Sequence, residues 1–507
     1  MLNTPDEAIA YLMGRVNYER QLPSTRRPAE FKLQSVRELA HRLGDPHLAA
    51  PVVHVAGTKG KGSTATMLAT IAKAAGIRCG LYTSPHLHRL EERFLVDLQP
   101  IDAQGLVAAV CEVKTEADRL LNDIESGKFD GAPPTFFDLV TLTAWVHFRN
   151  TECDLTVIEV GLGGRLDSTN ICQPLLGVIT SISRDHTAIL GDTLAEIAGE
   201  KAGIIKPNIE VLHGVQDDSA KQVIEQACKS NGCAIWRLDR DFAVQPHIEG
   251  PMDVEQNVEC EPAISYQTES TWDFVPLQLE RQVPIEYSKQ HSFLHELCGI
   301  ELNLAGAHQQ RNAALAIAAA QRLTSYGFEI DDRALLTGLQ DVALPGRIEW
   351  LRKSPQIVAD VAHNQAAVTA LVKTLSCHQY PDGRRIAIVS VSDDKDHEAI
   401  IDELLKFFDQ IVFTSFQTNP RARSARELAQ LTEKRQGEPG DHGISSRQVD
   451  VVAIDDPQEA LNEVLPGLKE HDQLVVTGST FLVAELRPSI ESYAVGISEA
   501  SLSMRES

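Results

Sequence analysis

The chain is poor in aromatic residues, has fewer basic than acidic residues, and contains no CxxC motif and no long apolar run. Its 47 lysines and arginines stand against 71 aspartates and glutamates, which gives a net charge of −24 at pH 7. Because so acidic a surface repels a phosphate backbone, a nucleic-acid partner is not expected. Phosphate or carboxylate ligands must instead be held by local features, such as loop amides and a few Lys or Arg side chains.

The 9 cysteines are scattered between Cys79 and Cys377, and nothing around the nearest pair, Cys228 and Cys233, resembles a zinc cluster. This usage indicates a reduced, cytoplasmic protein. No apolar segment is long enough to span a bilayer, so a membrane partner is not expected either. The N-terminal sequence carries two early acids and no long apolar run, which is not the pattern of a signal peptide.

With 507 residues, the chain exceeds what one hydrophobic core usually holds, so two domains are expected. From Val52 onward, strand-like runs alternate with helical patterns, which predicts crossover units and a mostly parallel sheet. The strands expected in this part are 52–56, 78–83, 155–160, 176–182 and 209–215. The helices expected between them are 63–75, 103–125, 136–149, 193–202 and 217–230.

The alternation fails over 240–303, where a small antiparallel insertion is expected. A second alternating series follows, with strands expected at 357–360, 384–390, 410–415, 449–454 and 473–479. The predicted fold class is α/β: a P-loop domain with a doubly wound, mostly parallel sheet, followed by a smaller Rossmann-like α/β domain. The predicted domains are 1–343, with N-terminal helices at 5–21 and 31–43, and 344–490, before a flexible tail at 491–507.

The stretch VVHVAGTKGKGST (52–64) has the pattern of a phosphate-binding loop. A buried strand leads into glycines, and Lys61, Ser63 and Thr64 open a helical segment. Glycines let backbone N–H groups close around a phosphate, and the lysine supplies a point charge. Gly62 between Lys61 and Ser63 departs from the standard spacing. The pattern favours nucleotide binding over an ordinary strand-to-helix connection.

Polar residues also stand at the ends of three further predicted strands. Ser84 follows the second strand, Glu159 lies at the end of the third, and His186 follows the fourth. Because the carboxyl ends of parallel strands meet at one sheet edge, these residues form a candidate ligand set for magnesium on nucleotide phosphates. Each residue taken alone is more often a helix cap or a core hydrogen-bonding group. For Lys201, the spacing alone indicates a solvated lysine at the end of a helix.

At this point a family resemblance is evident. The chain resembles folylpolyglutamate synthase/dihydrofolate synthase, a family of ATP-dependent amide ligases related to the Mur ligases. The matching stretches occur in order over nearly the whole chain. They are HVAGTKGKGST (54–64), TSPHL (83–87), TFFDLVTLTA (135–144), EVGLGGRLDSTN (159–170), DHTAILGDTLAEIAGEKAGIIK (185–206), AGAHQQRNAALA (305–316), LPGRIE (344–349), DVAHN (360–364), DDKD (393–396) and VTGSTFLVAELR (476–487).

The resemblance implies a role for each matching position. The residues it implies for catalysis are Lys61, His186 and Lys201. Those for ATP are Gly60, Lys61, Gly62, Ser63, Asn312, Arg347, Asp360 and His363. Those for magnesium are Ser84, Glu159 and His186. Those for the pterin or folate are Thr135, Phe136, Phe137, Asp138, Leu166, Asp167 and Ser168, with a contribution from 31–34.

Lys201 matches a lysine that is carbamylated in this family. A carbamate turns a cation into an anion and forms only on a neutral amine, so burial and a nearby metal must favour it.

Two positions depart from the family pattern. Lys59 stands where bacterial relatives mostly carry Asn, and Val361 replaces the usual Gly before Ala362, which raises a question about the backbone path there.

The resemblance also implies the reaction. ATP would phosphorylate a carboxylate, and the amine of glutamate would displace phosphate from the acyl phosphate. The expected cofactors are ATP and Mg²⁺, with a monovalent cation such as K⁺ as a further candidate. The expected partners are small molecules: L-glutamate with dihydropteroate, with a reduced folate, or with both acceptors in a bifunctional enzyme. A monomer is expected, in which a hinge near 341–346 closes the two domains over ATP.

Two alternatives remain at this stage. A Mur ligase acting on a UDP-sugar peptide would share both domains, but the 51 residues before Val52 are too few for the additional domain of those enzymes. A P-loop nucleotide-binding protein without ligase activity would not need a second α/β domain with its own matching motifs.

Overall fold

The computed structural model describes residues 2–19, 33–246, 271–276, 294–378, 380, 382–437 and 448–503. The chain divides into two compact units between Val342 and Ala343, and the short segment Leu304–Ala307 belongs to the second unit. The predicted α/β class is confirmed in both units, because each contains a mostly parallel sheet with helical connections.

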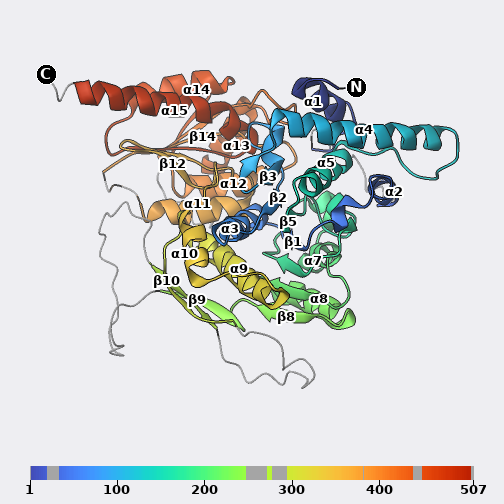
Figure 1. Ribbon diagram of the computed structural model, residues 1–507. Helices are drawn as coiled ribbons and strands as arrows, with labels where there is room; N and C mark the ends of the chain where they lie inside the picture. The colour runs from blue at the N-terminus through green and yellow to red at the C-terminus, as the bar shows by residue number, and fades with distance from the viewer. Residues whose placement is uncertain are drawn as a thin grey trace, which may run out of the picture. The chain divides into compact units, whose positions relative to one another are not determined.

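The sheet of the first unit has eight strands in the order β4-β3-β2-β5-β1-β6-β7-β8. Figure 1 labels β1, β2, β3, β5 and β8 of this sheet. Neighbours from β2 to β8 are parallel, whereas β3 and β4 form an antiparallel edge. The strands are β1 (Val52–Ala56), β2 (Cys79–Tyr82), β3 (Phe94–Val96), β4 (Gln99–Pro100), β5 (Leu155–Glu159), β6 (Leu176–Ile179), β7 (Glu210–His213) and β8 (Ala234–Arg237).

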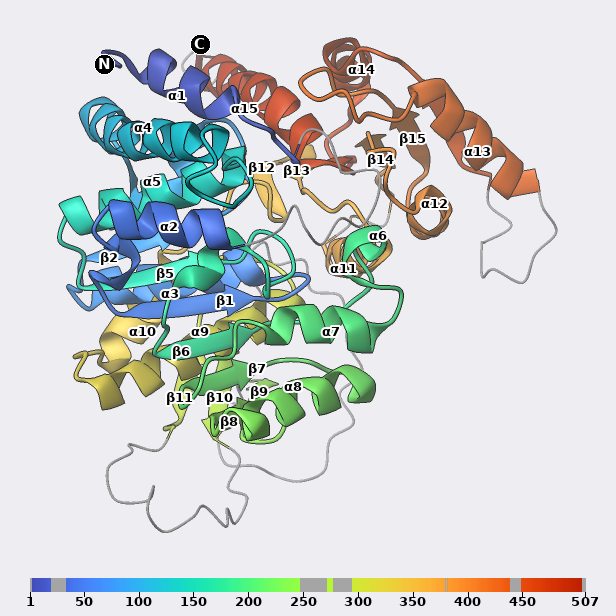
Figure 2. The same cartoon turned by 90° about the vertical axis from the view of Figure 1, so that its right-hand side faces the viewer.

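The central strand β1 is buried along its whole length and pairs with β5 on one side and β6 on the other. Val55 is in register with both Glu159 of β5 and Val178 of β6. The carboxyl ends of these three strands therefore lie side by side, which is where parallel α/β sheets bind ligands. Figure 2 shows β5, β1, β6 and β7 following one another across the sheet.

The helices of the first unit are α1 (Pro5–Met13), α2 (Gln34–Arg42), α3 (Lys61–Ala74), α4 (Ala103–Glu125), α5 (Phe136–Asn150), α6 (Thr187–Leu190), α7 (Leu194–Ala202), α8 (Asp218–Ser230), α9 (Ala307–Leu323) and α10 (Asp332–Gln340). Apolar residues of α1, α2, α4 and α5 share one core, and α7 and α8 cover β6 and β7 with a second. Helix α3, which starts at the phosphate loop, packs against α10.

The expected antiparallel insertion is present in the described part of 240–303. Strands β9 (Phe242–Pro246), β10 (Trp272–Pro276) and β11 (Leu297–Ile300) form a three-stranded antiparallel sheet. The rings of Phe242 and Phe274 lie 5.5 Å apart and are buried, so this small sheet has an apolar face. Residues 247–270 and 277–293 of the expected insertion lie outside the described residues.

The second unit has a six-stranded sheet in the order β12-β13-β17-β14-β15-β16, parallel except for the edge strand β12. The strands are β12 (Glu349–Lys353), β13 (Gln356–Ala359), β14 (Arg385–Val389), β15 (Gln410–Phe413), β16 (Asp450–Ala453) and β17 (Gln473–Thr477). The helices are α11 (Gln365–Ser376), α12 (His397–Leu405), α13 (Ala425–Gly437), α14 (Pro457–Val464) and α15 (Thr480–Ser503). Helices α11, α12 and α13 share one apolar core with the sheet.

The structure differs from the sequence-based expectations at three places. The first helix ends at Met13 rather than near residue 21, because the chain leaves the helix at Gly14. Strands β3, β4, β8 and β12 were not expected: β3 and β4 have only three and two residues, and β8 and β12 are edge strands. Residues 491–503 of the expected flexible tail continue helix α15, which has Pro488 in its interior. Among the described helices, none combines the length and the apolar character needed to cross a bilayer.

Candidate active site

The phosphate loop joins β1 to α3 and depends on Gly60. This residue caps α3 with a φ of +85°, a conformation that glycine adopts without steric cost. A Cβ atom on Gly60 would lie 2.3 Å from Oδ1 of Asn312 in α9, so the close approach of the two segments also requires glycine. Lys61 is the first residue of the helix, and Gly62 and Ser63 follow in its first turn. The loop therefore presents a helix N-terminus, which favours anions.

The loop is held from the side by the segment that leaves β6. Thr58 N donates to Ser181 O at 2.7 Å, and Lys59 N donates to Ser181 Oγ at 3.1 Å. The Thr180 hydroxyl returns a bond to Lys59 O at 2.6 Å. Thr180 and Ser181 were not expected to take part; their only sequence signal is their position at a strand end.

The side chain of Lys59 forms an ion pair with a residue of the segment after β6. Its Nζ atom lies 3.0 Å from Oδ2 of Asp185, the residue before His186. Lys61 Nζ, by contrast, lies 3.4 Å from the carbonyl oxygen of Thr58 inside the loop. The two lysines of the loop therefore point to different groups.

The expected metal ligands lie at or beyond the carboxyl ends of β5, β2 and β6, and β1 separates β5 from β6 in the sheet. Glu159 ends β5, is buried, and accepts a hydrogen bond from Ser84 N at 2.9 Å through Oε2. The same carboxylate lies against the loop, since a Cβ atom on Gly62 would be 3.4 Å from it. His186 is the N-cap residue of α6 and has a φ of +49°, and its backbone N donates to Asp185 Oδ1 at 3.0 Å. The structure thus brings Ser84 to Glu159 and connects His186 to the loop through Asp185.

The donor set fits magnesium. A buried carboxylate and a hydroxyl are the oxygen ligands that Mg²⁺ prefers, and this ion usually takes only one or two protein carboxylates beside phosphate and water. Within the described ranges, no three His, Cys, Asp or Glu side chains gather into a metal-binding group of their own.

Lys201 lies under the phosphate loop and is not solvated. Its side chain is buried in α7, and Nζ donates to the carbonyl oxygen of Gly57 at 2.8 Å. Burial, followed by repulsion from Lys61, lowers the pKa of Lys201 to about 7. A large fraction of this amine is therefore neutral near pH 7.

The residues expected to bind the pterin form one connected group. Thr135 caps α5, and Asp138 completes a capping box with it. Ser168 Oγ donates to Asp138 Oδ1 at 2.5 Å, which joins the start of α5 to the segment after β5. Phe136 is buried, whereas the ring of Phe137 is partly exposed and packs against Tyr82 and Gly161.

Asp167 stabilises the second half of this group, and Leu166 beside it is partly exposed. The carboxylate of Asp167 accepts bonds from Leu162 N at 2.9 Å and from Thr169 Oγ1 at 2.5 Å. Burial raises the pKa of Asp167 and that of Asp138. His54 of β1 extends the network, because its Nε2 lies 2.8 Å from Thr169 Oγ1. His54 was not expected to take part, and its position inside an apolar strand was its only signal.

The remaining expected ATP residues lie in two places. Asn312 is in the first unit, beside the phosphate loop as described above. In the second unit, Asp360 follows β13 and accepts bonds from Ile348 N at 2.9 Å and Ala362 N at 2.8 Å. The structure thereby brings the segments around Arg347 and His363 together at the end of β13. Arg347 is partly exposed, and His363 Nδ1 lies 2.8 Å from Val361 O.

Val361 is accommodated without a glycine. Its backbone N donates to Gly346 O at 2.9 Å, and its side chain is buried. Gly346 supplies the positive φ, +69°, and a Cβ atom on it would lie 2.9 Å from Val361 Cγ1. Of the segment 31–34, Phe31 and Lys32 lie outside the described residues, and Gln34 begins α2.

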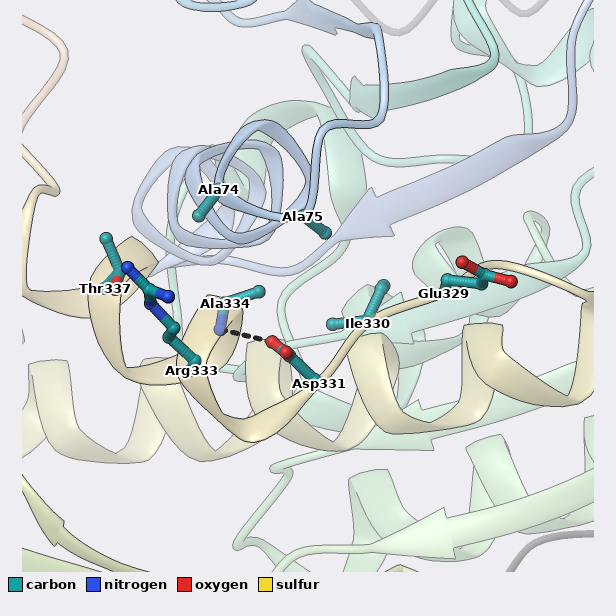
Figure 3. Close-up of a pocket in the computed structure, with 8 residues that line it drawn as sticks. All are labelled: Ala74, Ala75, Glu329, Ile330, Asp331, Arg333, Ala334 and Thr337. Atoms are coloured by element: carbon teal, nitrogen blue, oxygen red, sulfur yellow. Dashed lines mark hydrogen bonds between the residues drawn. The ribbon is translucent and has the colours of Figure 1, made fainter.

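A cavity of about 610 Å³ opens at the opposite end of α3 from Lys61 (Figure 3). It lies between the C-terminal residues of α3 and the start of α10, where Asp331 caps the helix by accepting a bond from Ala334 N at 2.8 Å. None of the expected site residues lines this cavity, so it is separate from the phosphate loop.

Comparison with known families and proteins agrees with this geometry. The Mur ligase middle domain matches residues 55–320, and the Mur ligase glutamate ligase domain matches residues 346–480. The fold and the site therefore define an ATP-dependent ligase of the Mur ligase type.

The relatives narrow this class. The chain is 32% identical to dihydrofolate synthase/folylpolyglutamate synthase of Bacillus subtilis over 466 residues, which cover 90% of this chain and 95% of the relative. It superimposes on Mycobacterium tuberculosis folylpolyglutamate synthase complexed with ADP with a TM-score of 0.77 at 28% identity, covering 96% of this chain and 98% of the other. For Escherichia coli FolC in complex with DHPP and ADP, the TM-score is 0.74 at 27% identity, with the same two coverages of 96% and 98%. The chain belongs to the dihydrofolate synthase/folylpolyglutamate synthase family.

Proposed function

We propose that this protein adds L-glutamate to dihydropteroate, which makes dihydrofolate, and also to the γ-carboxylate of reduced folates. The observation that carries the proposal is the juxtaposition of the phosphate loop, the buried Glu159 and the buried Lys201 at one edge of the sheet. Names of relatives with both activities support the choice of acceptors.

ATP is assigned to the phosphate loop. The N-terminus of the 14-residue helix α3 and the side chain of Lys61 supply local positive charge for the phosphates in a protein whose net charge is −24. Asn312 borders the loop and is the first unit's further candidate for nucleotide contact. Arg347, Asp360 and His363 of the second unit are assigned to ATP by the family resemblance. The neighbours that carry ADP or AMPPCP support the use of ATP.

Magnesium would be held by Ser84 and Glu159, with His186 as a nitrogen ligand. When bound, the ion would offset negative charge on the transferring phosphoryl group. A monovalent cation such as K⁺ has no group of described residues assigned to it.

Lys201 is proposed to carry a carbamate. Its neutral amine would attack the carbon of CO₂, a C–N bond would form as one C=O π bond opens, and the nitrogen would lose a proton to water. The resulting carbamate carries one negative charge. The lowered pKa of Lys201 supports this step because only the neutral amine reacts. The new anion would lie beside Lys61 and the carbonyl oxygen of Gly57, where it would orient the lysine toward the phosphates.

The pterin end of the acceptor is assigned to the group formed by Thr135–Asp138 and Leu166–Ser168. The partly exposed ring of Phe137 offers a stacking surface, and the buried carboxylates fix the two segments relative to each other. This arrangement is compatible with dihydropteroate and with a reduced folate, since the two share the pterin.

The reaction proceeds in two transfers. A carboxylate oxygen of the acceptor attacks the γ-phosphorus of ATP, the bond to the β-phosphate oxygen breaks, and ADP leaves. The amine of glutamate then attacks the acyl carbon, loses a proton to water, and displaces inorganic phosphate. Lys61 stabilises the charge on the phosphoryl group during the first transfer.

The test is ADP release by the purified protein with ATP, Mg²⁺ and L-glutamate, with dihydropteroate or tetrahydrofolate as acceptor. Both acceptors are expected to stimulate release, and Lys61→Ala is expected to lower it at least about a hundredfold. Lys73→Ala is the matched control, because Lys73 is exposed near the other end of the same helix. ADP release that neither acceptor stimulates would defeat the proposal.

A cytoplasmic location and a monomeric state are part of the same proposal. The eight cysteines among the described residues are free thiols, which supports a reducing, cytoplasmic location. The monomeric state stays a prediction.

A further inference from the structure

The second lysine of the phosphate loop, Lys59, is bound to the segment after β6 by both its backbone and its side chain. Lys59 N and Lys59 O contact the hydroxyls of Ser181 and Thr180 at distances between 2.6 and 3.1 Å. Its Nζ atom reaches further along the same segment to Asp185 Oδ2 at 3.0 Å. Lys59 thus joins the loop to this segment together with Thr58, and its side chain reaches Asp185.

Asp185 divides its two oxygens between different partners. Oδ2 accepts from Lys59, and Oδ1 accepts from the backbone N of His186 at 3.0 Å. Oδ1 also lies 3.8 Å from His186 Nε2, which is too long for a hydrogen bond. His186 itself has a φ of +49°, a conformation that a non-glycine residue keeps only when its surroundings enforce it.

The burial of the pair makes it more than a surface contact. The side chain of Asp185 is 10% exposed and that of Lys59 is 27% exposed. Removing one partner of such a pair leaves a charge that water solvates poorly. The ammonium group of Lys59 therefore contributes to the orientation of Asp185, whose other oxygen accepts from the backbone of His186.

We propose that Lys59 is a positioning residue: its ion pair with Asp185 holds His186 at the carboxyl end of β6, where a phosphate-bound divalent cation is expected. The lysine acts through Asp185 and not on the phosphates, and this separates its role from that of Lys61. The inference rests on the proposed function, because it concerns the same ATP–metal site.

The experiment compares Lys59→Met, Lys59→Arg, Asp185→Asn and the double variant Lys59→Met/Asp185→Asn with the unmodified protein. Two binding constants are measured. One is the dissociation constant of ATP in EDTA, by calorimetry. The other is the dissociation constant of Mn²⁺ for the complex with a non-hydrolysable ATP analogue, by electron paramagnetic resonance. Thermal unfolding checks that each variant is folded. If Lys59→Met does not fold, Lys59→Arg and Asp185→Asn still test the proposal.

Lys59→Met and Asp185→Asn are each expected to weaken Mn²⁺ binding about tenfold or more, as the loss of a group supporting a metal ligand usually does. ATP binding in EDTA is expected to change less than about threefold, and Lys59→Arg is expected to retain most of the Mn²⁺ affinity. Because the two side chains share one contact, the double variant is expected to be no weaker than the worse single variant.

Two results would overturn the proposal. If Lys59→Met weakens metal-free ATP binding tenfold while Asp185→Asn does not, Lys59 is a phosphate ligand. If the two single effects on Mn²⁺ simply add, the pair does not act as a unit. Both constants are obtained without turnover. A protein that fails to ligate glutamate would therefore still show whether the Lys59–Asp185 ion pair affects Mn²⁺ binding.

Discussion

The Nζ atom of Lys201 lies 2.8 Å from the carbonyl oxygen of Gly57, the first residue of the phosphate loop. The contact joins the last turn of α7 to the exit of β1 and places an amine with a pKa of about 7 directly under the loop. A lysine so placed is poorly suited to carry a permanent charge, since burial disfavours its ammonium form. A neutral amine at this position can instead react with CO₂ to form a carbamate.

We expect Lys201 to carry a carbamate whose occupancy rises with pH. Because the pKa is about 7, the fraction of neutral amine increases from pH 6 to pH 8. Carbon-13 NMR with labelled bicarbonate should show a carbamate signal that grows over this range and is missing in Lys201→Ala. Lys206, another lysine of the same region, stays in place in that variant and serves as the internal control. A signal that survives Lys201→Ala, or none at pH 8, would contradict the assignment.

Gly60→Ala is expected to abolish ATP binding, whereas Gly76→Ala is not. Both residues have positive φ, +85° and +77°, at opposite ends of α3, so both variants carry a similar backbone cost of about 1–2 kcal/mol. Only the Cβ atom at position 60 meets another group, Asn312 Oδ1 at 2.3 Å. Calorimetric titration with ATP measures the difference. Equal ATP affinities in the two variants would show that the approach of Asn312 to the loop is unimportant.

Gly161→Ala is expected to weaken the pterin acceptor selectively. Its Cβ atom would lie 2.3 Å from Cζ of Phe137, so the ring must move. Overpacking of this kind costs about 1–3 kcal/mol, and 1.4 kcal/mol expressed in binding is a tenfold higher KM for the acceptor. The KM for ATP should stay near its original value. Gly199→Ala, where a Cβ atom meets nothing within 4 Å, is the matched control. A rise in both KM values would indicate a general loss of structure.

His54 is expected to make the fold sensitive to acid. Burial lowers the pKa of His54 to about 3, below its ordinary value of 6.5. As the pH falls from 6.5 toward 3, the unfolded chain therefore takes up a proton that the folded chain refuses, and stability present above pH 6.5 is lost. One such histidine contributes a slope of at most about 1.4 kcal/mol per pH unit.

Urea unfolding of His54→Gln between pH 6.5 and 4 should show a smaller loss of stability than the unmodified protein. The exposed His88, changed to Gln, is the control for the loss of an imidazole. If His54→Gln and the unmodified protein lose stability in parallel, His54 is not a source of the acid sensitivity.

The sequence predicted most of the fold because the central strands carry a strong local signal. β1 and β5 are buried along their whole length and consist mostly of apolar residues, many of them β-branched. α4 and α5 begin at Asp102 and Thr135, which are residue types that commonly cap helices. The edge strand β3–β4 hairpin was missed because Asp97 and Leu98 form its turn with positive φ, without the glycine or asparagine that usually marks such a turn.

The sequence predicted individual residues of the site but not the contacts between their side chains. Lys61, Glu159 and Ser84 could be found from strand ends, since their places along the chain decide which sheet edge they reach. The partners of Lys59 and Lys201 could not be found in this way, because Asp185 and Gly57 lie 126 and 144 residues away from them along the chain. Spacing alone favoured a solvated Lys201, and the buried position of its side chain corrects that reading.

The most direct test of the account follows oxygen atoms through the reaction. Dihydropteroate or tetrahydrofolate labelled with ¹⁸O in the reacting carboxylate is incubated with the protein, ATP, Mg²⁺ and L-glutamate, and the inorganic phosphate is analysed by mass spectrometry. If the carboxylate attacks the γ-phosphorus and glutamate then displaces phosphate, one ¹⁸O atom appears in each phosphate formed, together with one new glutamate on the acceptor. Phosphate without ¹⁸O would mean that water attacks ATP, and it would contradict the acyl-phosphate ligase mechanism.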